Sequence, residues 1–256
     1  MSVKFFSYNL ITKDSTNISA SNVNAQYPLS NLKESINTKK TRSTTESFSI
    51  TFDLITTQNI NSILFNSFSW ESVDIKANIT SNFTSPLYST SIIPDEGEME
   101  YDFIYKQLGD RSYRFWQLTF HATAGIGYCE VGKIFLGEKV SLVNDDMVFG
   151  WTFDQKDYSV IKSNYVGQTF VDVVPNVQKI INGSFKYLTL ENLRIIQRLG
   201  DLHSKVYPIW LVADEDENVV NDLERNSMYG YLTAIPQEKN VRPKLYDLKI
   251  KMVECL

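Results

Sequence analysis

The residue types that most often carry catalysis or bind metals are few in this sequence. It contains two histidines, His121 and His203, and two cysteines, Cys129 and Cys255. Neither histidine has a second histidine, cysteine or carboxylate at metal-ligand spacing, and the cysteines form no CxxC pair. Free cysteine is commonly a buried core residue, so we expect two buried thiols. We therefore predict no catalytic residue, no metal and no cofactor.

The common nucleotide-binding and hydrolase motifs are also missing. The sequence has no G-x-S-x-G, H-E-x-x-H, P-loop or G-x-G-x-x-G pattern. Gly125 and Gly127 are interpreted as a tight turn, because glycine adopts positive φ without strain. His121 ends a predicted strand, and His203 ends a predicted helix, where a cation is favoured. We interpret both histidines as structural and expect the protein not to be an enzyme.

An acidic stretch at residues 213–224, ADEDENVVNDLE, invites comparison with a calcium-binding EF-hand loop. Asp214, Asp216 and Asn218 match the first, third and fifth positions of such a loop. Val219 replaces the glycine that the sharp turn needs, and Arg225 stands where a bidentate glutamate is required. The stretch is therefore predicted to be a solvated acidic loop, with a weak cation site as the alternative.

The segment NSFSWESV at residues 66–73 is the best candidate for a binding site. Phe68 and Trp70 fall in a predicted loop between two strands, with Glu71 beside them. Aromatic rings at a loop tip can stack on a sugar or fill a partner's pocket. The alternative is that both rings cover the open end of a β-sandwich core. Phe68, Trp70 and Glu71 are thus the candidate residues for binding a glycan or a protein partner.

The charge distribution gives little support to a nucleic-acid or membrane partner. The 256 residues include 25 Lys and Arg against 30 Asp and Glu, a net charge of −5. The densest basic cluster is Lys39, Lys40 and Arg42, which is smaller than the basic stripe of nucleic-acid-binding proteins. No apolar run approaches the roughly 20 residues that cross a bilayer, and the N-terminus lacks the apolar core of a signal peptide. We expect a protein made in a reducing cytoplasm.

The first half of the chain has the pattern of a series of short strands. Phe48, Ile50 and Phe52 alternate with Ser and Thr, and residues 72–79 repeat the alternation, as half-buried strands do. Residues 113–120 carry large side chains on both faces of one predicted strand. Strands at this spacing, with polar turns between them, predict a β-sandwich.

Near residue 140 the pattern changes, and we predict a second unit over residues 141–256. It combines strand-like runs with one helix at about 189–203. Thr189 is a suitable N-cap, and Glu191 lies in the first turn, where the helix dipole favours negative charge. The apolar stripe of this helix is formed by Leu193, Ile195, Ile196, Leu199 and Leu202. The predicted fold is mainly β: a β-sandwich at 1–140, then a β-barrel or sandwich with one packed α-helix.

Several elements of the first half occur in an order that is typical of one known family. Tyr27-Pro28 precedes a Thr41-Arg42-Ser43 element, and a strand ending in Phe52-Asp53-Leu54 follows. A Tyr113–Leu118 strand and a closing Glu130–Gly137 strand come later, with Val131 and Lys133 as departures from the pattern. Over residues 20–140 the chain resembles the discoidin-like (coagulation-factor C-type) jelly-roll sandwich, in the form found in bacteriophage virion proteins. The resemblance implies that the Arg114–Phe120 strand is central to the sandwich and buried on both faces. It also implies that residues 111–137 are scaffolding.

The second half has a fainter resemblance of its own. Residues 163–199 give a strand pair and an amphipathic helix, followed by YPIWLVAD at 207–214 and YGYLTAI at 229–235. This order is similar to the β-barrel-plus-helix subunits of phage tail tubes and distal tail rings. It implies a threefold or sixfold ring of identical subunits joined through edge strands, and other phage tail proteins as partners. Asp214 to Glu217 would then contribute to an acidic lumen that repels DNA.

Together the two resemblances imply a structural component of a bacteriophage tail or tail tip, located in the virion. Its C-terminal unit would form the ring, and its sandwich would project outward. The alternative function is a carbohydrate-binding module for attachment to a host-surface glycan. Neither reading implies a membrane or a sequence-specific nucleic-acid partner.

Overall fold

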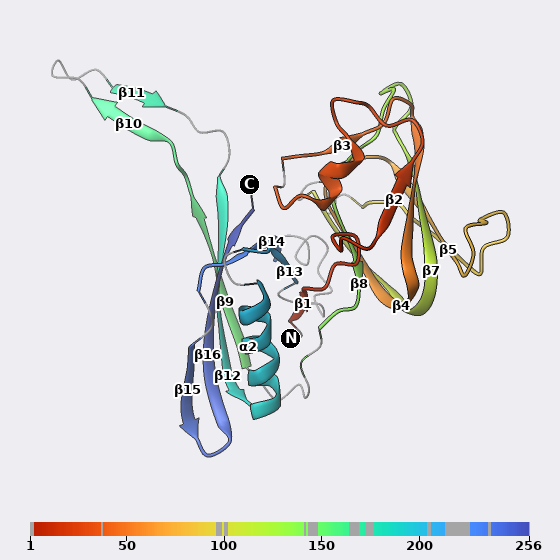
Figure 1. Cartoon of the computed structure of the whole chain (residues 1–256). Coiled ribbons are helices and arrows are strands. Elements are labelled where there is room, and N and C mark those ends of the chain that lie inside the picture. The colour runs from red at the N-terminus through yellow and green to blue at the C-terminus, as the bar shows by residue number, and fades with distance from the viewer. Residues whose placement is uncertain are drawn as a thin grey trace.

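Figure 1 shows the computed structural model, which describes residues 3–36, 38–95, 99, 102–140, 142, 148–163, 169–172, 177–203, 206–212, 226–234 and 237–255. Two antiparallel seven-stranded sheets and one α-helix dominate these residues. The predicted fold class is therefore confirmed as mainly β, with an N-terminal β-sandwich and a β-rich second unit that carries one helix. No helix in the described part of the chain is long and apolar enough to span a membrane.

The first unit is built on two long strands that bend together. β4 (Ser47–Ser69) and β7 (Phe103–His121) pair along most of their length, and their register shifts between Asp53 and Gln58. At this shift Ile55 has a φ of 67°, where the two strands curve (Figure 1). The two halves of the ribbon then face each other. Phe65, in the second half of β4, lies with its ring centroid 6.0 Å from that of Phe120, near the end of β7.

The other strands of the first unit complete this sandwich. They are β2 (Asn17–Ala20), β3 (Thr41–Arg42), β5 (Ser72–Asn78), β6 (Tyr88–Ile92) and β8 (Glu130–Gly137). Their order is β3-β8-β4-β7-β5-β6, with β2 paired to β4. A short 3-10 helix, η1 (Leu29–Lys33), packs beside β3 and β8.

The strand at residues 113–120 is central, as predicted, but it is not buried on both faces. Trp116, Leu118 and Phe120 are fully buried in the sandwich core, whereas Gln117 and Thr119 between them are half-buried. This alternation follows from the two-residue period of a strand whose second face is partly open to solvent. The prediction of two buried faces was therefore wrong.

The second unit is a sheet with a helix on one face. Its order is β1-β13-β14-β16-β12-β9, with β15 paired to β16. The strands are β1 (Lys4–Phe6), β9 (Val148–Lys156), β12 (Gln178–Leu188), β13 (Ile209–Val212), β14 (Ser227–Leu232), β15 (Gln237–Arg242) and β16 (Leu245–Glu254). A separate hairpin of β10 (Val160–Ser163) and β11 (Thr169–Asp172) extends from β9 (Figure 1).

The helix α2 (Leu190–His203) lies where the sequence predicted it. The Thr189 hydroxyl accepts a hydrogen bond from the Asn192 amide at 3.3 Å, which confirms the N-cap. Leu193, Ile196 and Leu199 are buried against the sheet, but Leu202 is 58% exposed. Nine residues turn a helix by about 900°, so Leu202 points away from the direction of Leu193. The prediction of Leu202 in the apolar stripe was wrong for this reason.

The boundary of the first unit also needs a correction at the N-terminus. Residues 1–140 were predicted to form one sandwich, but β1 pairs with β13 of the second sheet, with Phe5 opposite Leu211. Val3 and Phe5 belong to the core beneath the helix. The sandwich is therefore inserted between the first strand of the second unit and the rest of it. A strand of three residues carries no local signal of such a distant partner.

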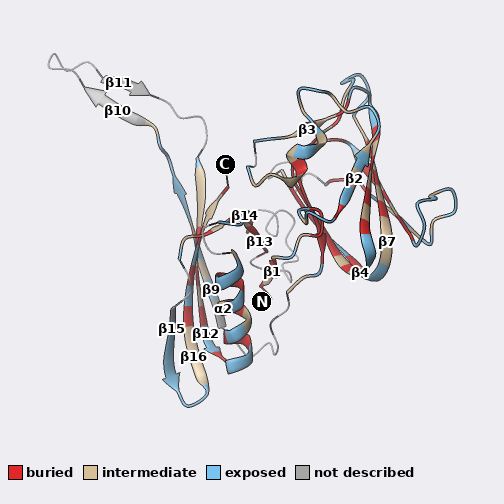
Figure 2. Cartoon of the chain, in the orientation of Figure 1, coloured by how far each residue is buried: buried red, intermediate tan, exposed pale blue. Residues whose placement is uncertain are grey.

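The two units share a third core, which fixes one against the other. It joins Phe6, Trp210, Val212, Tyr229 and Cys255 of the second unit to Leu64, Phe103, Tyr105 and Phe135 of the sandwich. Figure 2 shows buried residues on the strands of both units. Because residues alternate along a strand, one face of the second sheet packs on α2, and the opposite face meets the sandwich over β1, β13 and β14.

Candidate functional site

The three residues predicted to bind a glycan or a partner lie at the end of the sandwich core. The Trp70 side chain is 4% exposed, and its ring centroid is 4.7 Å from that of Phe68 and 5.3 Å from that of Phe65. Phe68 packs half-buried against the same core, and Glu71 is exposed. A sugar could stack on Trp70 only after the core opened. The position of the two rings is thus the one described by the alternative, a cover over the open end of the core.

His121 lies on the surface of the sandwich. Its Nε2 is 3.2 Å from a carboxylate oxygen of Asp74, and the Ser91 hydroxyl donates to the other oxygen of Asp74 at 2.5 Å. The hydrogen bond from Ser91, and then that from His121, holds the pKa of Asp74 below its ordinary value. In the described part of the chain, no cluster of three or more His, Cys, Asp and Glu residues could hold a metal.

His203 is half-buried, and the two cysteines are buried. Burial lowers the pKa of His203, which disfavours the cationic form expected at the end of the helix. Its Nδ1 is enclosed and has no hydrogen-bond partner among the described residues. Cys129 and Cys255 are buried free thiols, as predicted, and burial raises the pKa of Cys129 to about 11.

A pocket of about 310 Å³ lies where the two units meet, and we call it the tyrosine pocket. Tyr8 and Tyr207 are 60% and 62% exposed, whereas Trp210 and Tyr229 are buried in the core shared by the two units. The lining is Phe6, Ser7, Tyr8, Asn9, Thr12, Lys13, Lys33, Glu34, Ser35, His203, Tyr207, Pro208, Trp210 and Tyr229. Clefts between domains are common sites for small ligands.

Several polar groups of the tyrosine pocket already have structural tasks. The Asn9 side chain donates to the Ile134 carbonyl at 2.7 Å and accepts from the Leu136 amide at 3.1 Å. Lys33 donates to two backbone carbonyls, those of Lys13 and Thr16. These bonds tie the segment after β1 to the sandwich and hold the wall of the pocket in place.

Other groups of the pocket are placed to meet a ligand. The Lys13 ammonium lies 4.1 Å from the centroid of the Tyr8 ring, and Tyr207 follows α2, where its amide bonds the His203 carbonyl at 3.0 Å. The Lys13 ammonium and the two exposed tyrosine rings combine hydrogen-bonding capacity with aromatic surface. None of these residues was predicted, because they come from segments almost 200 residues apart.

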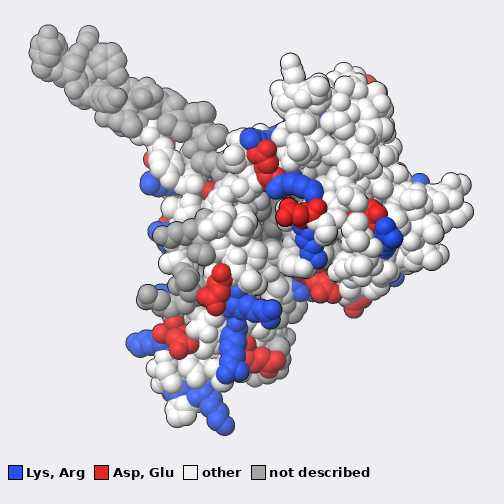
Figure 3. Space-filling model, in the orientation of Figure 1, with Lys and Arg blue, Asp and Glu red and all other residues white. Residues whose placement is uncertain are grey.

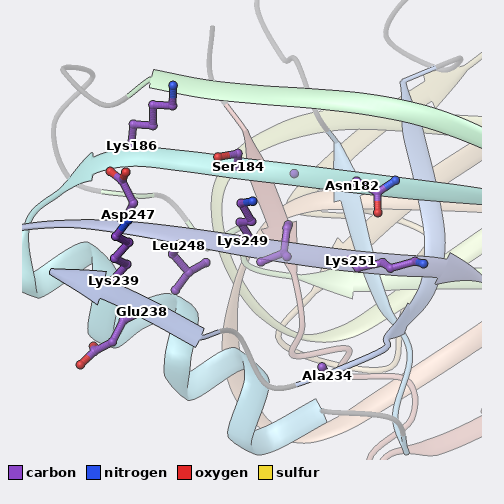
Figure 4. A pocket seen from close by; sticks show the side chains of 12 residues that line it. Asn182, Ser184, Lys186, Ala234, Glu238, Lys239, Asp247, Leu248, Lys249 and Lys251 are labelled. Atoms are coloured by element: carbon purple, nitrogen blue, oxygen red, sulfur yellow. The ribbon is translucent and has the colours of Figure 1, made fainter. Parts of the chain in front are cut away.

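A second hollow of about 850 Å³ runs over the open face of the second sheet, and we call it the lysine groove. Figure 4 shows four lysines around it, Lys186 on β12, Lys239 on β15, and Lys249 and Lys251 on β16. All four side chains are exposed. Asp247 lies between two of them, since it is opposite Lys239 in the β15–β16 pairing.

Two carboxylates, Asp247 and Glu238, line the groove together with the four lysines. On the face drawn in Figure 3, basic and acidic side chains are interspersed. The alternation of Lys249 and Lys251 along one strand was a readable signal, but their convergence with Lys186 and Lys239 depends on strand pairing. The acidic stretch at 213–224, with the predicted lumen residues Asp214 to Glu217, lies outside the described residues.

No protein-family model and no curated protein sequence match this chain. Among solved structures, it is similar to a chitosan-binding module of a Paenibacillus sp. IK-5 chitosanase/glucanase, at 14% identity and a TM-score of 0.41, over 51% of this chain and 99% of that chain. It is also similar to a Streptococcus pneumoniae fucose-binding module (11% identity, TM-score 0.39, 51% and 98% covered). A third is a Ruminococcus gnavus GH29 fucosidase (12% identity, TM-score 0.45, 53% and 28% covered).

The bacteriophage assignment gains nothing from these comparisons. None of the three structures named above is a tail protein. The tail role, the tail-protein partners and the virion location therefore stay predictions.

Proposed function

We propose that this protein is a non-enzymatic carbohydrate-binding protein that holds a glycan in the tyrosine pocket. The observation that carries the proposal is the combination, around one cavity, of two exposed tyrosine rings with polar groups that can reach a ligand. This is the function that the sequence offered as its alternative. The site, however, is moved from the Phe68–Glu71 loop to the junction of the two units.

The tyrosine rings would supply the contact with the apolar face of a sugar. A ring that is more than half exposed gains little from the protein core, and stacking a ligand on it removes apolar surface from water. Lys13 already lies against Tyr8, so a sugar bound on that ring would have an ammonium donor beside it. Such pairing of an aromatic face with a nearby donor fixes both the position and the orientation of a ligand.

His203 would supply a neutral hydrogen-bonding group. With its pKa lowered by burial, the imidazole carries one donor and one acceptor nitrogen near neutral pH. Its Nδ1 is enclosed, so a ligand would have to meet the other ring nitrogen. Binding is thereby favoured for a ligand rich in hydroxyl groups.

The same lining argues for binding without hydrolysis. Glycoside hydrolysis uses two carboxyl groups on either side of the scissile bond. Among the residues that line the pocket, Glu34 is the one carboxylate, and it is ion-paired with Lys39. We therefore propose no catalytic role for it.

The experiment is a glycan screen of the purified protein, followed by calorimetric titration with the glycans retained. Tyr8→Ala and Tyr207→Ala should each weaken binding by about fivefold, because aromatic stacking contributes about 1 kcal/mol. Tyr158→Ala is the matched control, since Tyr158 is also exposed but lies outside the pocket. If Glu71→Gln abolished binding while the double tyrosine variant still bound the glycan, the site would be the predicted Phe68–Glu71 loop and not the tyrosine pocket. Failure to bind any glycan would reject the function.

A second candidate is assembly of copies through the margin of the second sheet. β9 is an edge strand of the second sheet and pairs with β12 on one side. An edge strand favours pairing with another chain. The predicted threefold or sixfold ring, as part of a phage tail, would use this margin. Thr152→Pro, on β9, should block such pairing. The loss of assembly would be seen as a lower mass in solution.

A further inference from the structure

The lining of the tyrosine pocket carries more positive than negative charge. Its charged side chains are Lys13, Lys33 and Glu34. The carboxylate of Glu34 is ion-paired with Lys39, which lies outside the lining. Among the residues that the structure describes, neither Lys13 nor Lys33 forms an ion pair with a carboxylate. The pocket therefore holds two positive charges that no carboxylate of its lining compensates.

The ammonium group of Lys33 is held in place by neutral groups. It donates to the carbonyl oxygens of Lys13 at 3.2 Å and Thr16 at 2.9 Å, and Lys33 is half-buried. An ammonium has three N–H donors, so one of them is left for a ligand. Carbonyl groups accept hydrogen bonds but carry no net charge. The positive charge of Lys33 therefore stays available to an anion.

Lys13 is half-buried next to Lys33 and beside the ring on which a sugar would stack. Its ammonium lies 4.1 Å from the centroid of the Tyr8 ring. Its carbonyl accepts hydrogen bonds from the Lys33 ammonium and, at 3.1 Å, from the Thr16 amide. These two bonds fix the backbone that carries Lys13. The two lysines thus stand together on one wall of the pocket before any ligand binds.

This arrangement favours a negatively charged ligand over a neutral one. Two like charges in a partly buried site repel each other, and water screens them less than it does at an open surface. A carboxylate or sulfate group that contacts both ammonium groups relieves the repulsion and forms charge-assisted hydrogen bonds. Such bonds are about twice as strong as those between neutral groups. A neutral sugar would gain none of this stabilisation.

We propose that the ligand of the tyrosine pocket is an acidic glycan, whose carboxylate or sulfate group is bound by Lys13 and Lys33. This inference rests on the proposed function and adds to it the class of sugar that binds. The ring of the acidic sugar stacks on Tyr8, since Lys13 lies beside that ring. Tyr207 and His203 belong to the second unit and contact the remainder of the glycan.

The test is a glycan array in which each acidic oligosaccharide is paired with a neutral form of the same chain. The acidic members carry glucuronic, galacturonic or sialic acid or a sulfate ester, and their neutral partners are the methyl esters and the desulfated sugars. The acidic member of the pair that binds best should bind about tenfold more tightly than its neutral partner at low salt. The difference should shrink at high salt, because salt screens partly exposed charges.

Lys13→Gln removes one of the two charges and keeps a hydrogen-bond donor. It should weaken binding of the acidic glycan by about fivefold and change the affinity for the neutral partner much less. Lys13→Arg, which keeps the charge, should retain most of the preference. Lys76→Gln is the matched control, because Lys76 is also half-buried but lies on β5, outside the pocket. Lys13 is preferred to Lys33 for this test, since Lys33 also holds the wall of the pocket.

The outcomes separate this inference from the proposed function. Neutral glycans that bind as tightly as their acidic partners would overturn the inference and leave the proposed function in place. An equal loss for both members of a pair in Lys13→Gln would also overturn it, because Lys13 would then act only by positioning Tyr8. Failure to bind any glycan on the array would reject the function and the inference together.

Discussion

A buried lysine gives the sharpest test of the electrostatics of the sandwich. Lys133 lies on β8, 2% exposed, and its ammonium donates to the carbonyls of Asn31 at 2.7 Å and Lys39 at 3.2 Å. Burial lowers the pKa of Lys133 from 10.5 to about 8. The unfolded chain therefore holds a proton on this lysine over a pH range in which the folded chain has released it.

This difference makes stability depend on pH in a defined direction. Below pH 8 both states are charged, and the folded state bears the full cost of the buried charge. Between pH 8 and 10.5 the unfolded state binds more protons, so the free energy of unfolding rises with pH. A shift from 10.5 to about 8 corresponds to a gain of about 3 kcal/mol across this window.

The perturbation is Lys133→Met, which keeps an unbranched side chain and removes the titrating group. Urea unfolding of both proteins at a series of pH values gives the difference in unfolding free energy. As the pH rises from 8 to 10.5, the free energy of unfolding of the wild type should increase by about 3 kcal/mol relative to that of the variant. The pKa of buried Tyr229 is raised chiefly by burial. This residue is present in both proteins, so its contribution cancels in the difference between their unfolding free energies. A difference that stays constant with pH would refute the reasoning.

Three further predictions concern the packing and the ion pairs. Trp70→Ala should destabilise the protein by about 3–5 kcal/mol, because it empties a core position; a smaller loss in urea unfolding would show that the ring is not a core residue. Gly230→Ala should destabilise by about 1–3 kcal/mol or more, since its Cβ would lie 2.3 Å from the Val253 carbonyl oxygen; thermal unfolding measures this, and Gly150→Ala, with open space around its Cβ, is the control. Arg114→Gln should raise the pKa of Asp53, which the hydrogen bond from Arg114 lowers; an unchanged carboxyl titration by NMR would contradict the pairing of Arg114 with Asp53.

Local elements of this fold were predictable from the sequence because their signals are local. The α2 helix is specified by the Thr189 cap and by an apolar stripe, both contained within one segment. The sandwich strands are specified by alternation, as in Phe48, Ile50 and Phe52. Leu202 was assigned to the stripe because it continues a three-residue spacing. That spacing does not match the 3.6-residue period of a helix, so positions three residues apart move gradually around the helix.

The candidate sites were not predictable, because distant pairings create them. The tyrosine pocket forms where three parts of the chain meet: β1 with the segment after it, the sandwich, and the end of α2. Trp70 was predicted as a binding residue because a tryptophan in a short polar connection has the same sequence pattern whether it covers a core or faces solvent. Only its contacts with Phe65 and Phe120 distinguish the two.

The insertion of the sandwich explains why the pocket can hold a fixed shape. The chain lays down β1 in the second sheet, builds the sandwich, and then returns to the sheet at β9. Val140 closes this loop, since its amide donates to the Phe5 carbonyl at 2.8 Å. Two covalent connections and a shared core thus hold the units together. A pocket at such a junction loses little freedom when it binds a ligand, and preorganisation of this kind favours affinity.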